Sequence, residues 1–306
     1  MKPHPQVAAL LEAAARSPLP TLDKVSAFVA RRLYLERCKT VAPKNVPPIT
    51  GRIVLADGVV LRAYRPARDD VLPALVFFHG GGWTIGDLDT HDALCRQLAA
   101  GANCAVFAVE YRLAPESPFP AAVDDCLAAT AYVHREAAAL RIDPKRVAVG
   151  GDSAGGNLAA VLALHFPERL CFQLLIYPAT DQRYKEGSLT RNGQGYLLTL
   201  PLMERFRANY LPNAADHLDW RASPALAKGF KGLPPAFILT AGFDPLLDEG
   251  REYAELLSRD GVEVAYREYA DMIHGFILMG GVLDTANTAV ADCCAALRRA
   301  FDKVPA

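Results

Sequence analysis

The chain has 306 residues, of which 51% are apolar and 22% are charged, and its net charge is −1. This is a globular composition without the concentrated basic charge that nucleic acids and acidic membranes attract, so we expect no nucleic-acid partner. No stretch is apolar for long enough to cross a bilayer, so no stable membrane insertion is expected.

Two helices are predicted at the N-terminus, over Val7 to Arg16 and Leu22 to Glu36. Apolar residues recur at helical spacing in the second of them and predict one apolar stripe, formed by Leu22, Val25, Val29 and Leu33. Prolines at positions 43, 47 and 48 then end regular structure. We interpret residues 1–49 as an appendage packed on a main domain over residues 50–306.

Eight strands are predicted in the main domain, and most are nearly unbroken apolar runs, typical of strands buried on both faces. The first two flank Asp57-Gly58, a pair that favours a hairpin because both turn residues take positive φ. The candidates are Arg52 to Leu55, Val59 to Tyr64, Leu72 to Phe78, Ala105 to Val109, Val147 to Val149, Cys171 to Tyr177, Ala236 to Thr240 and Val262 to Tyr269.

Helical segments alternate with these strands, which predicts an α/β fold with a mostly parallel sheet of about eight strands covered on both faces. The segments are His91 to Ala100, Ala121 to Leu140, Asn157 to His165, Glu249 to Arg259 and Thr285 to Phe301. Residues 184–211 break the alternation and contain one helical piece, Leu202 to Tyr210. We expect this insertion over the C-terminal edge of the sheet, where open α/β sheets bind ligands.

The seven cysteines show no Cys-x-x-Cys spacing, and the adjacent Cys293 and Cys294 suit neither a standard disulfide nor a zinc pair. We therefore expect reduced thiols and no metal. Glu12 interrupts the apolar run Val7 to Leu11, so no secretory signal is recognised. Both observations favour a cytoplasmic protein.

The segment Gly151-Asp152-Ser153-Ala154-Gly155 matches G-x-S-x-G, the nucleophile elbow of α/β-hydrolases. It lies between a predicted buried strand and a predicted helix, which is the context that the motif requires. A sharp turn there exposes the Ser153 hydroxyl, and the flanking glycines let strand and helix approach closely. A glycine-rich turn without chemistry is the alternative.

A run of three glycines follows the strand that ends at Phe78, in His79-Gly80-Gly81-Gly82-Trp83. Such a run makes sense where backbone N–H groups must point into a tight space. We expect the N–H groups of Gly81, Gly82 and Ala154 to form an oxyanion hole. A phosphate cradle is disfavoured because no Gly-Lys-Ser/Thr follows, and His79 is expected to anchor the loop.

A nucleophilic serine needs a base and an acid that orients the base, in the chain order serine, acid, histidine in this fold. Three histidines follow Ser153. His274 is favoured over His165 and His217 because it comes just after the last predicted strand. Asp244 likewise follows a strand and is favoured as the acid, whereas Asp248 is expected to cap the next helix.

The sequence then resembles the hormone-sensitive-lipase family of bacterial carboxylesterases, also called family IV. The resemblance rests on H-G-G-G-W, Y-R-L-A-P-E-x-P-F-P-A-A, G-D-S-A-G-G, D-P-L-x-D-E and H-G-F, at positions 79–83, 111–122, 151–156, 244–249 and 274–276. It implies a catalytic triad, an oxyanion hole, and a helical cap over the site; the residues implied are Ser153, Asp244 and His274, with Gly81, Gly82 and Ala154.

The resemblance further implies hydrolysis of short- to medium-chain acyl esters through an acyl-enzyme, without metal or cofactor, and possible homodimers. The expected partner is a small-molecule ester. Aromatic residues beside the glycine run or in the insertion are candidates for lining the pocket: Trp83, Tyr184, Tyr196 and Phe206. Two other functions stay open, an amidase or deacetylase with the same triad and a non-catalytic ligand-binding protein of this fold.

Overall fold

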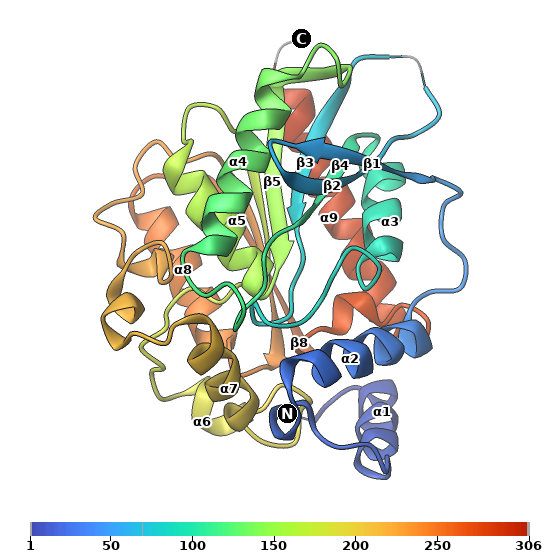
Figure 1. The fold of residues 1–306 in the computed structure, drawn as a ribbon, viewed down its shortest axis with the longest axis vertical. Coiled ribbons are helices and arrows are strands. Elements are labelled where there is room, and N and C mark those ends of the chain that lie inside the picture. Colours follow the sequence, from blue (N-terminus) through green and yellow to red (C-terminus); the bar gives the residue numbers. More distant parts are fainter. Residues whose placement is uncertain (1, 69, 305–306) are drawn as a thin grey trace.

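An eight-stranded sheet forms the centre of this computed structural model, which describes residues 2–68 and 70–304 (Figure 1). The strand order is β1-β2-β4-β3-β5-β6-β7-β8. The hairpin of β1 and β2 joins β4 in antiparallel orientation, and all later pairings are parallel. The strands are β1 Gly51–Ala56, β2 Val59–Tyr64, β3 Leu72–Phe78, β4 Ala105–Glu110, β5 Ile142–Asp152, β6 Phe172–Ile176, β7 Ala236–Phe243 and β8 Val264–Ile273.

The predicted strands are confirmed, and the apolar runs explain why they occupy the centre of the sheet. All seven residues of β3 are buried, as expected for a strand covered on both faces. Asp57 and Gly58 both take positive φ in the β1–β2 turn. The strands β5 and β8 extend further than predicted, and β8 ends directly before His274.

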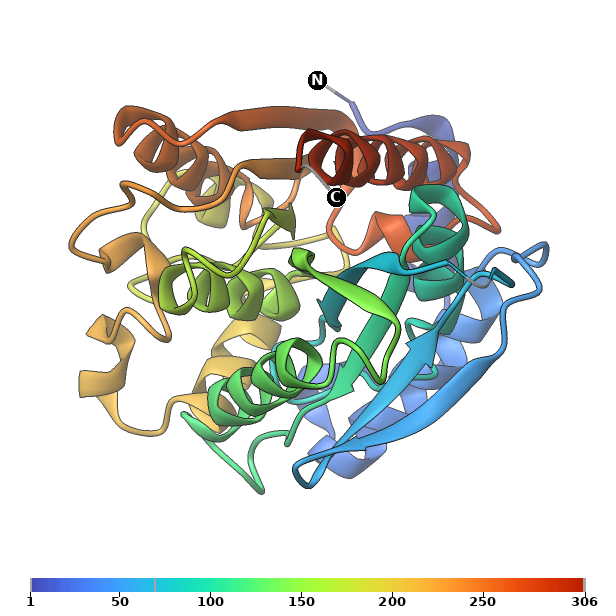
Figure 2. The ribbon, with the colours of Figure 1, turned by 90° about the horizontal axis from the view of Figure 1, so that it is seen from above.

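Helices cover both faces of the sheet. Buried side chains of α3 and α9 share one core cluster, and those of α4, α5 and α8 share the other. Seen from above, α3 and α9 lie across the strands from α4 and α5 (Figure 2). The helices are α1 Pro5–Ala15, α2 Ala27–Val41, α3 Asp92–Ala102, α4 Ala121–Arg135, α5 Ala154–His165, α6 Ser188–Asn192, α7 Leu200–Tyr210, α8 Leu247–Arg259 and α9 Asp284–Lys303.

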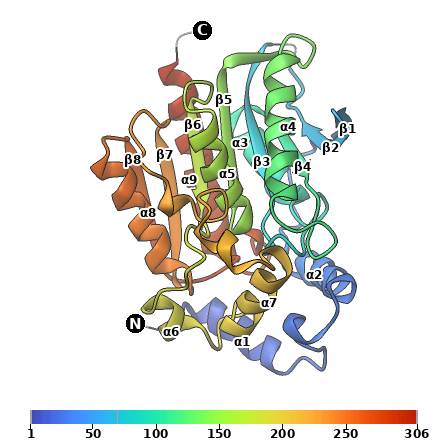
Figure 3. The ribbon, with the colours of Figure 1, turned by 60° about the vertical axis from the view of Figure 1, so that its left-hand side comes forward.

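The helices α1, α2, α6 and α7 gather at the carboxyl end of the parallel strands (Figure 3). The second N-terminal helix differs from its prediction. Leu22–Lys24 is a separate 3₁₀ turn, and α2 starts after Ser26, whose side chain accepts a hydrogen bond from the Val29 N–H as an N-cap. The predicted apolar stripe is therefore split, and Val29 is exposed.

Two strand registers bring distant segments to the same edge of the sheet. Phe78 of β3 pairs with Gly151 of β5, so the glycine run and the elbow leave the sheet side by side. Phe243 of β7 pairs with Ile273 of β8, so the next residues, Asp244 and His274, also emerge together. All four loops therefore meet at one edge.

Candidate active site

Ser153 lies in a strained turn between β5 and α5, with φ 56° and ψ −117°. Such a conformation is rare for a residue with a side chain and is typical of a nucleophile elbow. A Cβ on Gly155 would lie 1.9 Å from the Phe78 carbonyl oxygen, and one on Gly151 would lie 2.4 Å from Gly155. Only glycine fits at these two positions, because strand and helix approach so closely.

His274 joins Ser153 to Asp244 in one chain of hydrogen bonds. The Nε2 atom lies 2.9 Å from Ser153 Oγ, and Nδ1 lies 2.7 Å from Asp244 Oδ2. The Asp244 side chain is 0% exposed, whereas the imidazole retains 11% exposure toward the cavity. The Tyr177 ring packs against the imidazole at 4.6 Å between centroids. The structure thus brings together the three residues predicted from motif order.

The rival candidates lie elsewhere. His165 stacks edge-on against Phe166 at the end of α5, and His217 approaches the Leu211 carbonyl oxygen. Asp248 does not cap α8 as predicted, because the helix begins at Leu247, two residues before the predicted start, and Leu246 is its N-cap. Its carboxylate instead accepts a hydrogen bond from the Ser188 N–H and pairs with Arg191, which fastens α6 to α8.

The glycine run forms a tight loop beside Ser153. Gly81 and Gly82 take positive φ, at 123° and 57°, and a Cβ on Gly81 would lie 2.1 Å from the Ile85 carbonyl oxygen. Within the described part of the chain, the backbone N–H groups of Gly81, Gly82 and Ala154 donate no hydrogen bond. All three residues line the cavity that contains Ser153, so their donors are available to an oxyanion there.

A buried contact between Asp152 and His91 supports this loop from the sheet side. Asp152 Oδ1 accepts a hydrogen bond from the Gly80 N–H at 2.9 Å and contacts His91 Nε2 at 2.9 Å. Burial alone raises the pKa of Asp152, but His91 and the Gly80 N–H outweigh it, so that this pKa lies below its ordinary value. No pattern in the sequence identifies His91 as the partner of Asp152.

His79 has the contacts of a loop anchor. Its ring stacks on Tyr111 at 4.3 Å, its Nδ1 lies 2.9 Å from the Gly80 carbonyl oxygen, and the Tyr111 hydroxyl donates to the His79 carbonyl oxygen. Burial, followed by the nearby His91, lowers the pKa of His79 to about 4. His79 is therefore neutral at physiological pH.

The cavity above Ser153 has a volume of about 730 Å³, within the usual range of small-molecule sites. Three of the four predicted aromatic residues line it: Trp83, Tyr184 and Phe206. Tyr196 does not, because its ring packs on Phe243. Phe206 lies so close to the glycine loop that a Cβ on Gly82 would be 2.1 Å from its ring.

The N-terminal helices supply much of the remaining wall. Apolar side chains from α1, α2 and the turn between them face the cavity, among them Leu10, Leu11, Leu22, Leu33 and Tyr34. The predicted apolar stripe of the second segment includes Leu22 and Leu33, but the sequence analysis placed none of these five side chains in the cavity. The wall is thus built from residues far apart in sequence.

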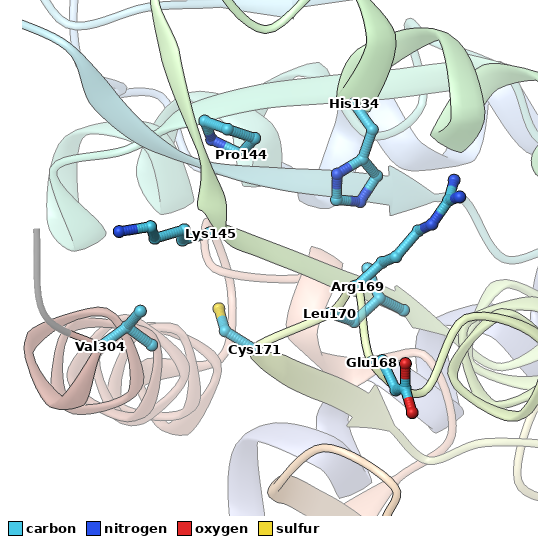
Figure 4. Close-up of a pocket in the computed structure, with 8 residues that line it drawn as sticks. All are labelled: His134, Pro144, Lys145, Glu168, Arg169, Leu170, Cys171 and Val304. Atoms are coloured by element: carbon cyan, nitrogen blue, oxygen red, sulfur yellow. The ribbon is translucent and has the colours of Figure 1, made fainter.

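A second hollow, near the other end of β5, differs from the cavity above Ser153. It has a volume of about 550 Å³, and Lys145, His134 and Glu168 are among its lining residues. Lys145 and Glu168 point away from each other (Figure 4), so the charged groups do not converge on a ligand. Among residues 2–68 and 70–304, no group of three or more His, Cys, Asp or Glu could hold a metal ion.

The remaining sequence predictions concern membranes and thiols. In the described part of the chain, none of the helices combines the length and apolarity needed to span a bilayer. All seven cysteines are free thiols, as predicted, and only Cys171 is not buried.

Comparison with known proteins gives a consistent picture. Residues 75–278 match the family model described as the alpha/beta hydrolase fold. The chain is 43% identical over 285 residues to carboxylesterase NlhH of Mycobacterium tuberculosis, with 88% of each chain covered. It is 39% identical over 291 residues to ethyl acetate hydrolase of Pseudomonas putida, covering 91% of this chain and 92% of the relative.

Solved structures agree over almost the whole chain. An ester hydrolase from the metagenome of Lake Arreo, complexed with a bipyridine phosphonate derivative, superposes with a TM-score of 0.93 at 38% identity, covering 99% of this chain and 100% of the other. The hyperthermophilic esterase of Pyrobaculum calidifontis gives 0.92 at 34% identity, with 98% and 99% covered. The chain therefore belongs to the α/β-hydrolase fold family.

Proposed function

We propose that this carboxylic ester hydrolase acts through a Ser153–His274–Asp244 triad and an acyl-enzyme intermediate. The observation that carries the proposal is the continuous hydrogen-bond chain from Ser153 Oγ through the imidazole to the buried Asp244 carboxylate. The motif set also supports membership of the hormone-sensitive-lipase branch of the family.

The reaction proceeds in two acyl-transfer steps. Ser153 Oγ bonds to the ester carbonyl carbon while His274 Nε2 takes its proton, and the protonated imidazole then gives that proton to the departing alcohol. Water repeats the sequence on the acyl-enzyme, which releases the acid and restores the Ser153 hydroxyl. Asp244 holds the imidazole with Nδ1 protonated and stabilises its cationic form.

The oxyanion formed in each step is stabilised by the N–H groups of Gly81, Gly82 and Ala154. One such donor typically lowers the barrier by roughly 3 kcal/mol. The loop is built beforehand, since Asp152 and His79 hold it from below. The donors therefore need little rearrangement when charge develops.

The substrate class is proposed to be short- to medium-chain acyl esters. The cavity volume of about 730 Å³ and its mostly apolar wall favour a small apolar ester. Residues 1–49 and 184–211 form the cap in this proposal, because both contribute side chains to the wall above Ser153. Trp83, Tyr184 and Phe206 then contact the substrate.

The decisive experiment compares wild type with Ser153→Ala on p-nitrophenyl esters from acetate to palmitate. For wild type we expect the highest kcat/KM on the short- and medium-chain esters. For Ser153→Ala we expect no hydrolysis above the uncatalysed rate. A fluorophosphonate should label wild type at Ser153 only. Turnover by Ser153→Ala contradicts the triad, a matched amide hydrolysed faster than its ester indicates an amidase, and failure of labelling favours a non-catalytic ligand-binding role.

Two further properties are proposed, the cellular compartment and the oligomeric state. The seven free thiols suit a reducing compartment such as the cytoplasm. A homodimer follows from the family resemblance alone, and sedimentation velocity of the purified chain measures it directly.

A further inference from the structure

Arg31 on α2 reaches across to the loop that carries the glycine run. Its Nε donates to the Thr84 carbonyl oxygen at 2.8 Å, and its Nη2 donates to the Ala114 carbonyl oxygen at 3.0 Å. The same guanidinium forms a two-pronged ion pair with Glu116, at 2.9 and 2.6 Å. Only 27% of the Arg31 side chain is exposed, so a partly buried guanidinium joins α2 to the catalytic domain at this point.

The two carbonyl groups lie on segments that are tied to the glycine loop. The Ala114 N–H donates to the Trp83 carbonyl oxygen at 2.8 Å. The N–H groups of Thr84 and Ile85 both donate to the Gly81 carbonyl oxygen, at 3.1 and 2.9 Å. Beyond the Arg31 guanidinium itself, the connection to Gly81 runs only through the backbone and its hydrogen bonds.

The loop depends on such contacts because its own backbone is unusual. Gly81, Gly82 and Trp83 all have positive φ, and no helix or strand includes them. On the insertion side the ring of Phe206 presses on Gly82 and Tyr210 stacks on Trp83 at 4.4 Å. Arg31 supplies the corresponding support from the N-terminal side.

The helix that carries Arg31 is itself anchored beside the histidine loop. The Gly281 N–H donates to the Val41 carbonyl oxygen at 2.9 Å, at the end of α2. Gln6 at the start of α1 exchanges two hydrogen bonds with Asp284, at 3.0 and 3.1 Å. The N-terminal segment is thus fixed at both ends to the stretch of chain that follows His274, and it contacts the glycine loop in its middle.

We propose that Arg31 is a positioning residue that sets the oxyanion donors of Gly81 and Gly82 from the N-terminal helix. This inference rests on the proposed function. In this proposal the N-terminal segment does more than line the cavity, since its position determines the direction of the Gly81 and Gly82 N–H groups. Loss of Arg31 should weaken stabilisation of the transition state and leave ground-state binding of the ester almost unchanged.

The carbonyl contacts, and not the ion pair, carry this role. Glu116 is 60% exposed, and exposed ion pairs contribute little. A lysine at position 31 has one ammonium in place of a planar fork and cannot span Thr84 and Ala114 together in the same way. Arg31→Lys should therefore restore only part of what Arg31→Ala loses.

The experiment measures kcat and KM on one short-chain p-nitrophenyl ester, together with Ki for a trifluoromethyl ketone of matched chain length. Ser153 adds reversibly to the ketone carbon, its proton moves to His274, and the resulting alkoxide occupies the oxyanion hole. For Arg31→Ala we expect kcat to fall about 10- to 100-fold with KM within about twofold. The Ki should rise by the same factor by which kcat/KM falls, and Arg31→Lys should lie between.

Arg32→Ala is the matched control, because Arg32 is the next residue of α2 and is exposed. It should keep the wild-type kcat and Ki. The inference is overturned if Arg31→Ala matches Arg32→Ala, or if it raises KM alone, or if it only lowers Tm. Those outcomes leave the proposed function intact, whereas the proposed function itself fails if wild type shows no turnover that depends on Ser153.

Discussion

His274 Nε2 lies 2.9 Å from Ser153 Oγ, although 121 positions separate the two residues in the sequence. In the proposed mechanism the proton of the Ser153 hydroxyl passes along this contact, so the position of the imidazole decides the rate. The identity of the acid that orients this imidazole can also be tested. Asp244 and Asp248 are close in sequence, but only Asp244 contacts His274.

Asp244→Asn should lower kcat about 10³- to 10⁴-fold with little change in Tm, because an amide at this position no longer holds Nδ1 in the protonated form. The control is Asp248→Asn, since that carboxylate bonds Ser188 and Arg191 instead of the imidazole. It should retain activity within about threefold of wild type. Equal losses in the two variants would contradict the assignment of Asp244.

Phe206→Ala should shift the acyl-chain preference toward longer esters, because its ring fills the space between Gly82 and the cavity. The residue is 8% exposed, so the truncation should also lower the free energy of unfolding by about 3 kcal/mol. Ratios of kcat/KM for octanoate over acetate, and urea unfolding, measure the two effects. The control Phe28→Ala, at a position 66% exposed on α2, should change neither quantity. An unchanged octanoate-to-acetate ratio in Phe206→Ala would contradict contact between this residue and the acyl chain.

The buried pair of Asp152 and His91 should matter for stability as well as for the loop. Asp152→Asn leaves His91 without its charged partner at a site where both side chains are almost fully buried, so we expect a loss of about 3 kcal/mol and a reduced kcat. Asp57→Asn provides the comparison, because its pair with Arg135 is about half exposed and should contribute less than about 1 kcal/mol. Similar unfolding midpoints for both variants would contradict the larger contribution of the Asp152–His91 contact to stability.

His79 should give the protein a measurable acid sensitivity. Its pKa falls from 6.5 to about 4 on folding, so the unfolded chain binds a proton more readily between these values. This part of the stability is present above pH 6.5 and is lost as the pH drops toward 4. Between pH 7.5 and 5 the loss should amount to about 2 kcal/mol.

His79→Asn keeps a donor near the Gly80 carbonyl oxygen and removes the titrating group. Urea unfolding of wild type and variant at the two pH values should therefore show a smaller pH dependence in the variant, whatever its absolute stability. An identical pH dependence in both proteins would show that His79 is not the titrating group.

Much of the fold was predictable because strongly apolar runs can only be strands or helices that are buried. The run Leu72 to Phe78 is fully buried, and Asp57-Gly58 turns as its φ preferences require. Weaker local signals were misread. The predicted second helix includes the 3₁₀ turn at Leu22–Lys24, and no helix is predicted at α6, because the five residues Ser188–Asn192 are too few to show a helical period.

Local patterns were enough to propose the chemistry: a serine at a sharp turn, three glycines after a strand, and an acid and a histidine after two later strands. The fold brings these groups together, since the pairings of Phe78 with Gly151 and of Phe243 with Ile273 depend on the order and register of strands. It also placed Arg31 against the glycine loop and Asp152 against His91. Contacts of this kind join residues without a shared local pattern, because packing and not spacing along the chain brings them together.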